Sequence, residues 1–465
     1  MDFITFLQNS LTEQLPQIIA SYPGAVSAES LAAMETSIRE MTQQLGGEIL
    51  KQLLEAQTEK YPADECACPH CGANATYERR REGTIITLLG RIRFRRPYYL
   101  CSHCGRGHYS LDEALGIEPG QMSQEVRQMA ALVAVHASFG KSSDLLYRLT
   151  RIELSPNSIR KATQQIGQQI VQREAALVEV SQDLEAQQAH KRVQQKPQQI
   201  YGSLDGFMSH IDDKWHEMKA GAWWTTNGQH AEQIQYYTDF RTAADFSALT
   251  WATGFGRLAD QAEVVIFIAD GAEWIWRIVS EHFPQAVQIV DWYHAFSYVQ
   301  TVAQAAFSDT AVRDDWIEQQ RQALRHGRRS VVFRACRQLM DAAPDAVKRA
   351  LTFFTNQRAR MRYDRYRAAG YQIGSGTMES GCKQLGLGRL RIAGAQWSAQ
   401  GARLVAKARA AYLSGEWDEL PAPAAALPHV ARQILHAPKP SKIFVISPNT
   451  TILFYSHIIT RKKLQ

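Results

Sequence analysis

Two short cysteine motifs constrain the fold of this chain more than any other feature of its 465 residues. The segments CPHCG and CSHCG place Cys68 beside Cys71 and Cys101 beside Cys104, each pair with two residues between. The 29 residues that separate the pairs are rich in β-prone runs. A C-x-x-C-G turn can present two thiolates to one tetrahedral zinc ion, with the glycine relieving the tight turn. We therefore expect a structural Zn²⁺ site in a small β module.

Other interpretations of these cysteines stay open. The four thiols could form a redox pair or remain unpaired, and Cys66, His70 and His103 are nearby rival ligands. A closed four-sulfur site leaves no position for a substrate, so a zinc ion there would stabilise a fold and not catalyse a reaction. Cys336 and Cys382 are expected to be unpaired.

The composition is typical of a soluble globular protein from a reducing compartment. Seven cysteines, an odd number, fit a reduced metal-binding protein better than a disulfide scaffold. The start MDFITFLQNS lacks the basic region of a signal peptide, and the apolar run KIFVISPNTTILFYSHIIT is too interrupted to span a membrane. The net charge of +6 permits nucleic-acid binding without requiring it. We expect a cytoplasmic protein with no membrane contact.

The chain changes character several times, which indicates a multidomain α/β protein. We expect an N-terminal helical region at 1–60, a zinc-ribbon-like β module at 61–118, a helical module at 119–184, a linker at 185–199, the first part of an α/β core at 200–299, a helical insertion at 300–372, the last core helix at 373–416 and a tail of unassigned role at 417–465.

Within the core, three acids directly follow apolar runs typical of strands. Asp205 lies in IYGSLDG, Asp270 in VVIFIADG, and Asp291 follows VQIV. Three antiparallel-looking strands and then two strand–helix units predict an α/β sheet that binds ligands at the C-terminal ends of its strands. An acid in such a place often caps the next helix or turn, which would explain any one of them. Together they predict a row of carboxylates that Mg²⁺ or Mn²⁺ would neutralise.

Glu379 is the fourth candidate ligand and the only acid in the stretch YQIGSGTMESGCKQLG. Glycines and small residues around it would let the start of a helix lie close to the sheet and to a phosphate. A helix cap is the plain alternative. Two metal ions held by a few carboxylates can drive phosphoryl transfer, one by activating water or a 3′-hydroxyl and the other by stabilising the leaving oxygen.

Two helical patterns, SFGKSSDLLYRL and LSPNSIRKATQQIGQQI, are joined by a short polar turn. Ser155 is a natural N-cap and Pro156 suits the first helical position. Asn157, Arg160 and Lys161 then lie near the helix start, where a helix-turn-helix protein presents side chains to base edges. Simple packing of a helical hairpin is the alternative.

Basic residues gather in several further segments. The run RIRFRR alternates arginine with apolar residues, and residues 318–367 hold 13 Lys/Arg against four acids. A solvated surface is the plain alternative, but contact with DNA phosphates accounts better for the bias in charge. The candidate DNA contacts are Arg91, Arg93, Arg95, Arg96, Arg328, Arg329, Arg360, Arg362, Lys383, Arg389 and Arg391.

Several ordered segments resemble a DDE transposase with an RNase H-like core. The segments LDG, IADGAEWIWRIVSEHFPQAVQIVDWYHA and GSGTMESGCK are similar to its three blocks, the middle one in the pattern of the mutator-like superfamily. The cysteine pairs with LLGRIRFRRPYYLCSHCG and SLDEALGI resemble bacterial insertion-sequence transposases of the ISKra type. The likeness covers roughly residues 60–415.

This resemblance implies that Asp205, Asp270 and Glu379 are the catalytic triad that binds Mg²⁺, with Asp291 and His294 as an accessory pair. Whether Asp291 also binds metal stays open, and His294 could contact the scissile phosphate or only a helix start. The implied activity is cleavage and strand transfer of double-stranded DNA at the inverted repeats of the protein's own element, by a homo-oligomer in the bacterial nucleoid. The alternatives are an RNase H-fold nuclease that cuts without joining, and a catalytically dead zinc-ribbon regulator.

Aromatic residues close to two of these acids also have two interpretations. Trp274, Trp276, Trp292 and Tyr293 could stack on bases exposed during strand transfer. Packing in the core is the plain alternative, and it is the more common role of such side chains.

Overall fold

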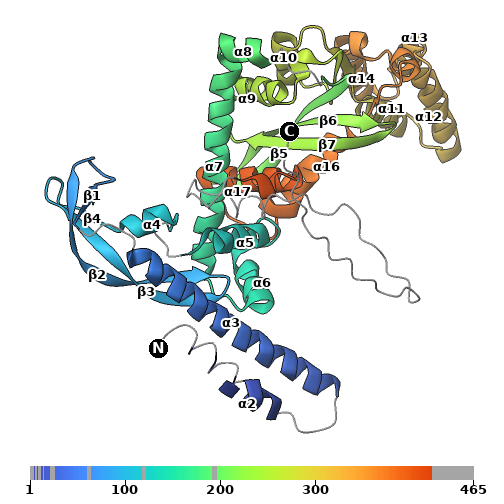
Figure 1. The fold of residues 1–465 in the computed structure, drawn as a ribbon. Coiled ribbons are helices and arrows are strands. Elements are labelled where there is room, and N and C mark those ends of the chain that lie inside the picture. Colours follow the sequence, from blue (N-terminus) through green and yellow to red (C-terminus); the bar gives the residue numbers. More distant parts are fainter. Residues whose placement is uncertain are drawn as a thin grey trace, which may run out of the picture. The chain divides into compact units, whose positions relative to one another are not determined.

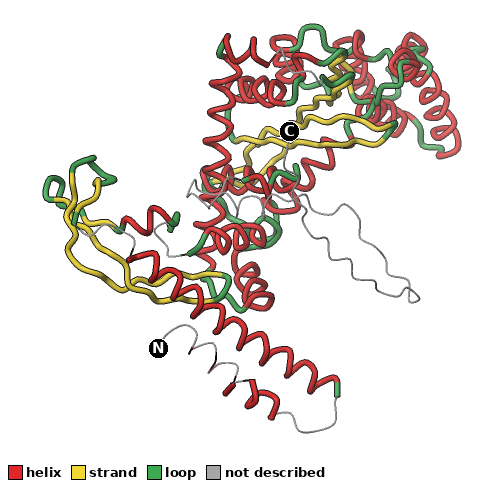
Figure 2. The backbone as a smooth tube through the Cα atoms, viewed as in Figure 1, coloured by secondary structure: helices red, strands yellow, loops and turns green. Residues whose placement is uncertain are grey.

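The computed structural model describes residues 15–20, 27–59, 64–117, 122–190 and 196–420, with a few isolated positions nearer the N-terminus. Its helices and two sheets make a mixed α/β protein, as the sequence predicts (Figures 1 and 2). The tail from residue 421 onward, with its apolar run, and most of the first ten residues lie outside this part of the chain. No helix of the described residues is both long and apolar enough to cross a membrane.

The first sheet follows the long helix α3 (Ala28–Glu59), which is preceded by α2 (Leu15–Ala20). It is antiparallel, and its strands in order are β1 (Glu65–Ala67), β2 (Asn74–Thr87), β3 (Gly90–Cys101) and β4 (Gly107–His108). Ile92 and Phe94 on β3 are buried with Leu54 of α3, so α3 covers one face of this sheet. The short helix α4 (Ser110–Ala114) follows.

Four helices connect this module to the second sheet: α5 (Gln124–Ala134), α6 (Phe139–Thr150), α7 (Pro156–Gln182) and α8 (Leu184–His190). The expected cap is confirmed, because the Ser155 hydroxyl accepts a hydrogen bond from the Ser158 N–H at 3.1 Å. Helix α7 also packs against α17 (Ala399–Leu413). A Cβ on Gly167 would lie 2.2 Å from the Leu404 carbonyl oxygen, so the close approach of these helices requires glycine.

The second sheet has the strand order β7-β6-β5-β8-β9. Its members are β5 (Gln199–Ile211), β6 (Lys214–Asn227), β7 (His230–Asp239), β8 (Val264–Ala269) and β9 (Val287–Val290). The first three are antiparallel, and β8 and β9 run parallel to β5. Helices α9 (Ala243–Gly256) and α10 (Glu273–His282) make the crossovers to β8 and β9. This plan of three antiparallel strands and two strand–helix units is the one the sequence predicts.

Helices cover both faces of this sheet (Figure 1). On one face, a Cβ on Gly254 of α9 would meet the Trp223 ring at 2.7 Å. On the other, a Cβ on Gly381 of α16 (Gly376–Leu385) would meet the Tyr236 ring at 2.3 Å. Because side chains alternate along a strand, odd-numbered residues of β5 face α16, whereas Gly202 contacts the Trp223 side.

The segment between β9 and α16 is helical, as expected for an insertion. It consists of α11 (Trp292–Ala306), α12 (Thr310–Arg325), α13 (Arg329–Gln338), α14 (Pro344–Asn356) and α15 (Tyr363–Ala368). Two hydrogen bonds attach it to the sheet: the Tyr363 hydroxyl donates to the Val290 carbonyl at 3.0 Å, and the Gln357 amide donates to the Gly271 carbonyl at 2.9 Å.

Candidate active site

The parallel strands of the second sheet place three of the predicted acids in one row. Strand β5 pairs with β8 from Gln199↔Val264 to Gly202↔Phe267, and β8 pairs with β9 up to Ala269↔Val290. Continued along the same register, these pairings bring Asp205, Asp270 and Asp291 to one level of three adjacent strands. Neighbouring strands lie about 4.8 Å apart. The register of the parallel strands is therefore compatible with the predicted row of carboxylates, which stays a prediction.

One detail of the expectation is wrong. Asp205 does not end its strand, because β5 continues to Ile211 in antiparallel pairing with β6. The parallel partner β8 is the shorter strand and ends at Ala269. Asp205 consequently lies on the surface of the sheet at the point where its parallel neighbour stops, and Asp270 is the first residue beyond that neighbour.

Asp205 is a partly buried carboxylate in an unfavourable environment. Its Oδ1 accepts a hydrogen bond from the Gly206 N–H at 2.7 Å. Burial raises its pKa above the ordinary value, and the negative charge of Asp270 raises it further. The Cys382 thiol of α16 donates a hydrogen bond to Asp205, which opposes these effects. Burial and the neighbouring charge destabilise the ionised form of this carboxyl group, and a bound cation would stabilise it.

Asp270 stabilises the turn before α10 with one carboxylate oxygen and leaves the other available to a ligand. Its Oδ1 accepts a hydrogen bond from the Ala272 N–H at 2.9 Å, so it stabilises the turn that leads into α10. Gly271 has a φ of +112°, a conformation that favours glycine. The second Oδ of Asp270 makes no hydrogen bond with a residue that the structure describes, and it is free for a ligand.

Glu379 lies near the start of α16, which packs against β5 and β6. Its side chain is 64% exposed and forms an ion pair with Lys383 at 2.7 Å. The pKa of the neighbouring Cys382 thiol is strongly raised, first by burial and then by the charges of Asp205, Asp270 and Glu379. Burial and the negative charges of all three predicted triad members thus act on the Cys382 thiol.

These carboxylates do not form a closed cation cage. Of the described residues, only the four cysteines form a group whose ligand atoms all lie within 4.8 Å of one another. Glu379 is held away by Lys383 and would have to turn toward the row to share a cation with Asp205 and Asp270.

Unlike the other acids, Asp291 has hydrogen-bond donors on both of its carboxylate oxygens. It is 5% exposed, and its Oδ1 accepts a hydrogen bond from the His294 N–H at 2.6 Å as the N-cap of α11. Its Oδ2 accepts hydrogen bonds from the N–H of Ser375 at 2.5 Å and from the Ser375 hydroxyl at 2.8 Å. Asp291 therefore joins the start of α11 to the segment that begins α16, and the His294 ring packs against Tyr298 and Phe353.

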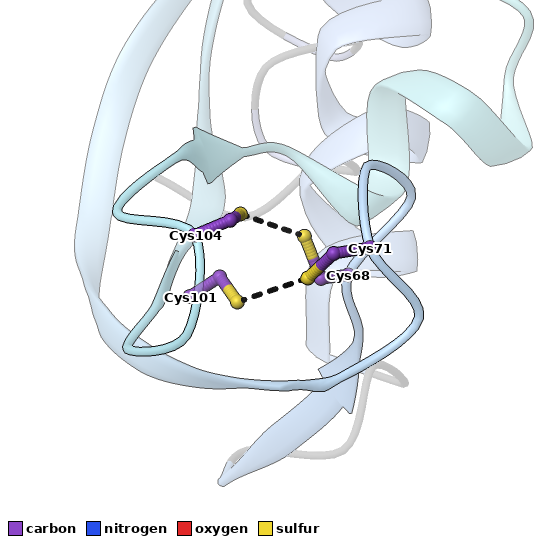
Figure 3. A group of neighbouring side chains, drawn as sticks. All are labelled: Cys68, Cys71, Cys101 and Cys104. Carbon is purple, nitrogen blue, oxygen red and sulfur yellow. Dashed lines mark hydrogen bonds between the residues drawn. The ribbon is translucent and has the colours of Figure 1, made fainter.

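The four cysteines of the two C-x-x-C motifs converge at one end of the first sheet (Figure 3). Their sulfurs lie 3.7 Å apart for Cys68 and Cys104 and 3.6 Å apart for Cys71 and Cys101, and none forms a disulfide. A tetrahedral zinc ion with bonds of about 2.3 Å requires sulfurs about 3.8 Å apart. Backbone N–H groups of Cys104 and His103 help to lower the pKa of the Cys101 thiol to about 6. The four cysteines could hold a metal such as zinc.

Comparison with known proteins places this architecture in a family. Residues 27–419 match the uncharacterised protein family UPF0236. The chain belongs to UPF0236. A UPF0236 protein of Caldanaerobacter subterraneus subsp. tengcongensis is 26% identical over 174 residues, which are 37% of this chain and 36% of that protein. The matched region of the chain thus covers about a third of the length of this relative.

The expected DNA contacts divide into exposed and buried side chains in this UPF0236 chain. On β3 the predicted alternation is confirmed, since Arg91, Arg93 and Arg95 are exposed between buried apolar residues. Other exposed members are Asn157, Lys161, Arg328, Arg362, Lys383 and Arg391, whereas Arg160, Arg329 and Arg360 are partly buried. The partly buried Arg360 donates to the Gln288 amide oxygen at 2.7 Å and lies over the Trp276 ring.

Two of the expected DNA contacts are corrected by the structure. Arg96 is 6% exposed and forms an ion pair with Asp112. Arg389 is 1% exposed, and its guanidinium donates to the Ala134 carbonyl and lies over the Phe139 and Trp397 rings. Both side chains hold elements together and are unavailable to DNA.

Two residues that contact these acids are not predicted from the sequence. Cys382 was expected only to be unpaired, but it lies against Asp205; its spacing of three from Glu379 places both on one helix face. Ser375 fixes Asp291 from 84 residues away, and no local sequence signal marks that contact.

Proposed function

We propose that this UPF0236 protein is a DNA transposase that cleaves DNA and transfers strands at the inverted repeats of its own insertion sequence. The observation that carries the proposal is the acidic site itself: Asp205 and Asp270 at one level of neighbouring parallel strands, with Glu379 on the helix that packs over Asp205. The resemblance to DDE transposases of the ISKra type names these three residues as the triad. The sheet order and the helical insertion between Asp270 and Glu379 support an RNase H-like core.

The donor set of the acidic site fits Mg²⁺ or Mn²⁺, because carboxylate oxygens are hard ligands. Divalent ions, when bound, would activate a water or 3′-hydroxyl and stabilise the leaving oxygen of an in-line displacement. Asp205 and Asp270 would hold them, since burial and then the charge of Asp270 raise the pKa of Asp205, and a bound cation would offset both effects. Glu379 would exchange its ion pair with Lys383 for the cation and bring α16 into the site.

Asp291 serves the proposed reaction as a positioning residue. Both of its oxygens are committed to N–H and hydroxyl donors of His294 and Ser375. Its hydrogen bonds fix the backbone immediately before α16, and thereby the position from which Glu379 reaches the row. We therefore place three carboxylates at the metal ions, with Asp291 behind them.

The exposed arginines give the proposed enzyme its DNA surface. Those of β3 form one face of a strand, and none of Arg91, Arg93 and Arg95 makes an ion pair with a described carboxylate. Phosphate contacts of this kind bind double-stranded DNA without reading its sequence. A structural Zn²⁺ in the four-cysteine site would keep this zinc-ribbon-like module folded. Acting on chromosomal DNA as a homo-oligomer, the protein would work in the bacterial cytoplasm, at the nucleoid.

A strand-transfer assay tests this proposal. Purified protein, Mg²⁺, DNA carrying the sequences that flank its gene and a supercoiled target plasmid are incubated together, and the products are sequenced. The proposal predicts plasmids joined to the end DNA, with a short target duplication. Cleaved ends without joined product would instead support a metal-dependent nuclease, and binding without cleavage a DNA-binding regulator.

A further inference from the structure

A polar and aromatic cavity is lined mostly by residues that follow Asp291 along the chain, and none of its lining residues is a carboxylate. Its volume is about 450 Å³, within the range of small-ligand sites. Three aromatic side chains and two arginines line it, together with backbone and amide groups; the lining side chains that matter here are Trp292, Tyr293, Tyr371, Arg325, Arg367 and Gln229. Trp292 and Tyr293 directly follow Asp291 in the sequence, so the cavity adjoins the proposed active site.

The aromatic wall is exposed in a way that hydrophobic packing does not explain. Tyr293 is 69% exposed, although aromatic side chains of this size are usually more buried. A Cβ on Gly374 would lie 2.9 Å from this ring, so the ring rests on a glycine that leaves it room. The Trp292 indole stacks on Phe296, and its buried Nε1 donor has no hydrogen-bond partner among the described residues.

The polar wall offers charge and hydrogen bonds that the protein leaves unused. Arg325 and Arg367 are exposed and form no ion pair with any carboxylate in the described part of the chain. The Gln372 amide is committed, since it accepts from the Trp224 indole at 3.2 Å and donates to the Gln229 carbonyl at 2.9 Å. The Gln229 side chain, in contrast, makes no hydrogen bond with a described residue.

We infer that this cavity binds one unpaired nucleotide of a DNA strand held at the acidic site. An aromatic face stacks on any base, an unpaired guanidinium binds the phosphate, and an amide can hydrogen-bond the base edge. A nucleotide uses all three features, whereas a bare phosphate has no use for the rings and an apolar ligand none for the arginines. The inference deepens the proposed function by naming a subsite of the DNA, and it rests on that function only in taking DNA as the source of the nucleotide.

The test uses the full-length protein in EDTA, so that binding is measured apart from cleavage. Fluorescently labelled oligo(dT) of eight nucleotides is titrated with protein, beside the same strand carrying abasic sites, which keeps the phosphates and removes the bases. Stacking of one base is worth about 5- to 150-fold in affinity. We expect the abasic strand and the Tyr293→Ala variant each to bind at least about fivefold more weakly. Tyr293→Phe should bind as wild type does.

Controls separate this inference from its rivals. Leu53→Ala removes an apolar side chain that is 57% exposed on α3, outside the cavity, and it should leave binding unchanged. Gly374→Ala, which displaces the Tyr293 ring, should reproduce the loss. Equal binding of the abasic and normal strands, or of Tyr293→Ala and wild type, would overturn the inference, as would binding of thymidine monophosphate as tightly as the strand. The strand-transfer assay tests the proposed catalysis, whereas these binding measurements in EDTA test the cavity alone, so failure of one claim is distinguishable from failure of the other.

Discussion

Asp205 and Asp291 lie in the same row of the sheet but in opposite chemical situations. Asp205 is partly buried beside another carboxylate, and both burial and the Asp270 charge raise its pKa. Asp291 is almost fully buried, but three donors satisfy its oxygens. A carboxylate that destabilises the folded chain indicates a functional role, whereas a carboxylate whose oxygens are all hydrogen-bonded indicates a structural role. The two residues therefore predict opposite effects of mutation.

Asp205→Asn is expected to raise the thermal midpoint at pH 7.5 in EDTA, because the amide keeps the hydrogen bond from Gly206 and removes the charge. The pKa of Asp205 is raised in the folded chain from an ordinary value of 3.8, so the folded state holds the extra proton. Its contribution to stability therefore falls as pH rises from about 4 through the folded pKa. The gain from Asn should shrink at pH 4. Circular dichroism melts at both pH values measure this.

Glu273→Gln is a matched control for Asp205→Asn, because the Glu273 side chain is 90% exposed outside the row. It should leave the midpoint nearly unchanged at both pH values. Added Mg²⁺ should raise the midpoint of the wild type and of the control but not of Asp205→Asn. A lower midpoint for Asp205→Asn at pH 7.5 would contradict the assignment of Asp205 as a strained ligand.

Asp291→Ala should destabilise the protein even without metal. It leaves the N–H groups of His294 and Ser375 without their acceptor at a buried position. Loss of a helix cap and of a buried charged hydrogen bond together cost about 2–4 kcal/mol of unfolding free energy. Urea denaturation in EDTA measures the change. A loss below about 0.5 kcal/mol, the scale of a surface substitution, would show that Asp291 does not fix the segment before α16.

Among the elements, the first sheet carries the four cysteines at one end, and a zinc ion bound there would stabilise the fold of that end. Cys68 and Cys101 are buried, yet the surrounding apolar cluster is small, with few residues other than the cysteines themselves. Small modules of this kind commonly gain their stability from metal binding. Removal of the metal would then unfold the end of this sheet that contains β1 and β4.

Metal analysis of the purified protein is expected to find about one zinc per chain. Cys68→Ser or Cys101→Ser should lose that zinc and expose residues 65–108 to limited proteolysis. Cys336→Ser is the control, since Cys336 is a buried cysteine of the helical insertion, far in sequence from this sheet. Zinc retained in Cys101→Ser at the wild-type level would exclude the four-sulfur site.

Local patterns explain which elements the sequence could predict. The paired cysteines, the Ser155 cap and the alternation of arginine with Ile92 and Phe94 each act within a few residues, and the structure contains all three. The register that aligns Asp205 with Asp270 depends on the pairing of β5 with β8, and the order of strands alone does not set it. Side-chain partners distant in sequence could not be predicted. The burial of Arg389 depends on the carbonyl of Ala134, 255 residues away, and nothing near Arg389 indicates it.

At the scale of the whole molecule, buried charges join the helical module to the α/β core. Lys407 of α17 is 1% exposed and forms ion pairs with Glu174 of α7 and Asp239 of β7. The buried Arg409 donates to the carbonyls of Val135, at the end of α5, and Gln384, in α16. Helix α16 carries Glu379, so Arg409 of α17 links the end of α5 to the helix proposed to complete the active site.

The central claim is that Asp205, Asp270 and Glu379 act together on DNA through divalent metal. The most direct measurement is the strand-transfer assay with Asp205→Asn, Asp270→Asn and Glu379→Gln, each beside Glu273→Gln and each checked for DNA binding. We expect Mg²⁺-dependent joining by wild type and by Glu273→Gln. Joining should fall by at least about a hundredfold in each of the three variants with DNA binding retained, since each removes a ligand of the reacting metal ions. Joining at the wild-type rate by any one of the three would contradict the central claim.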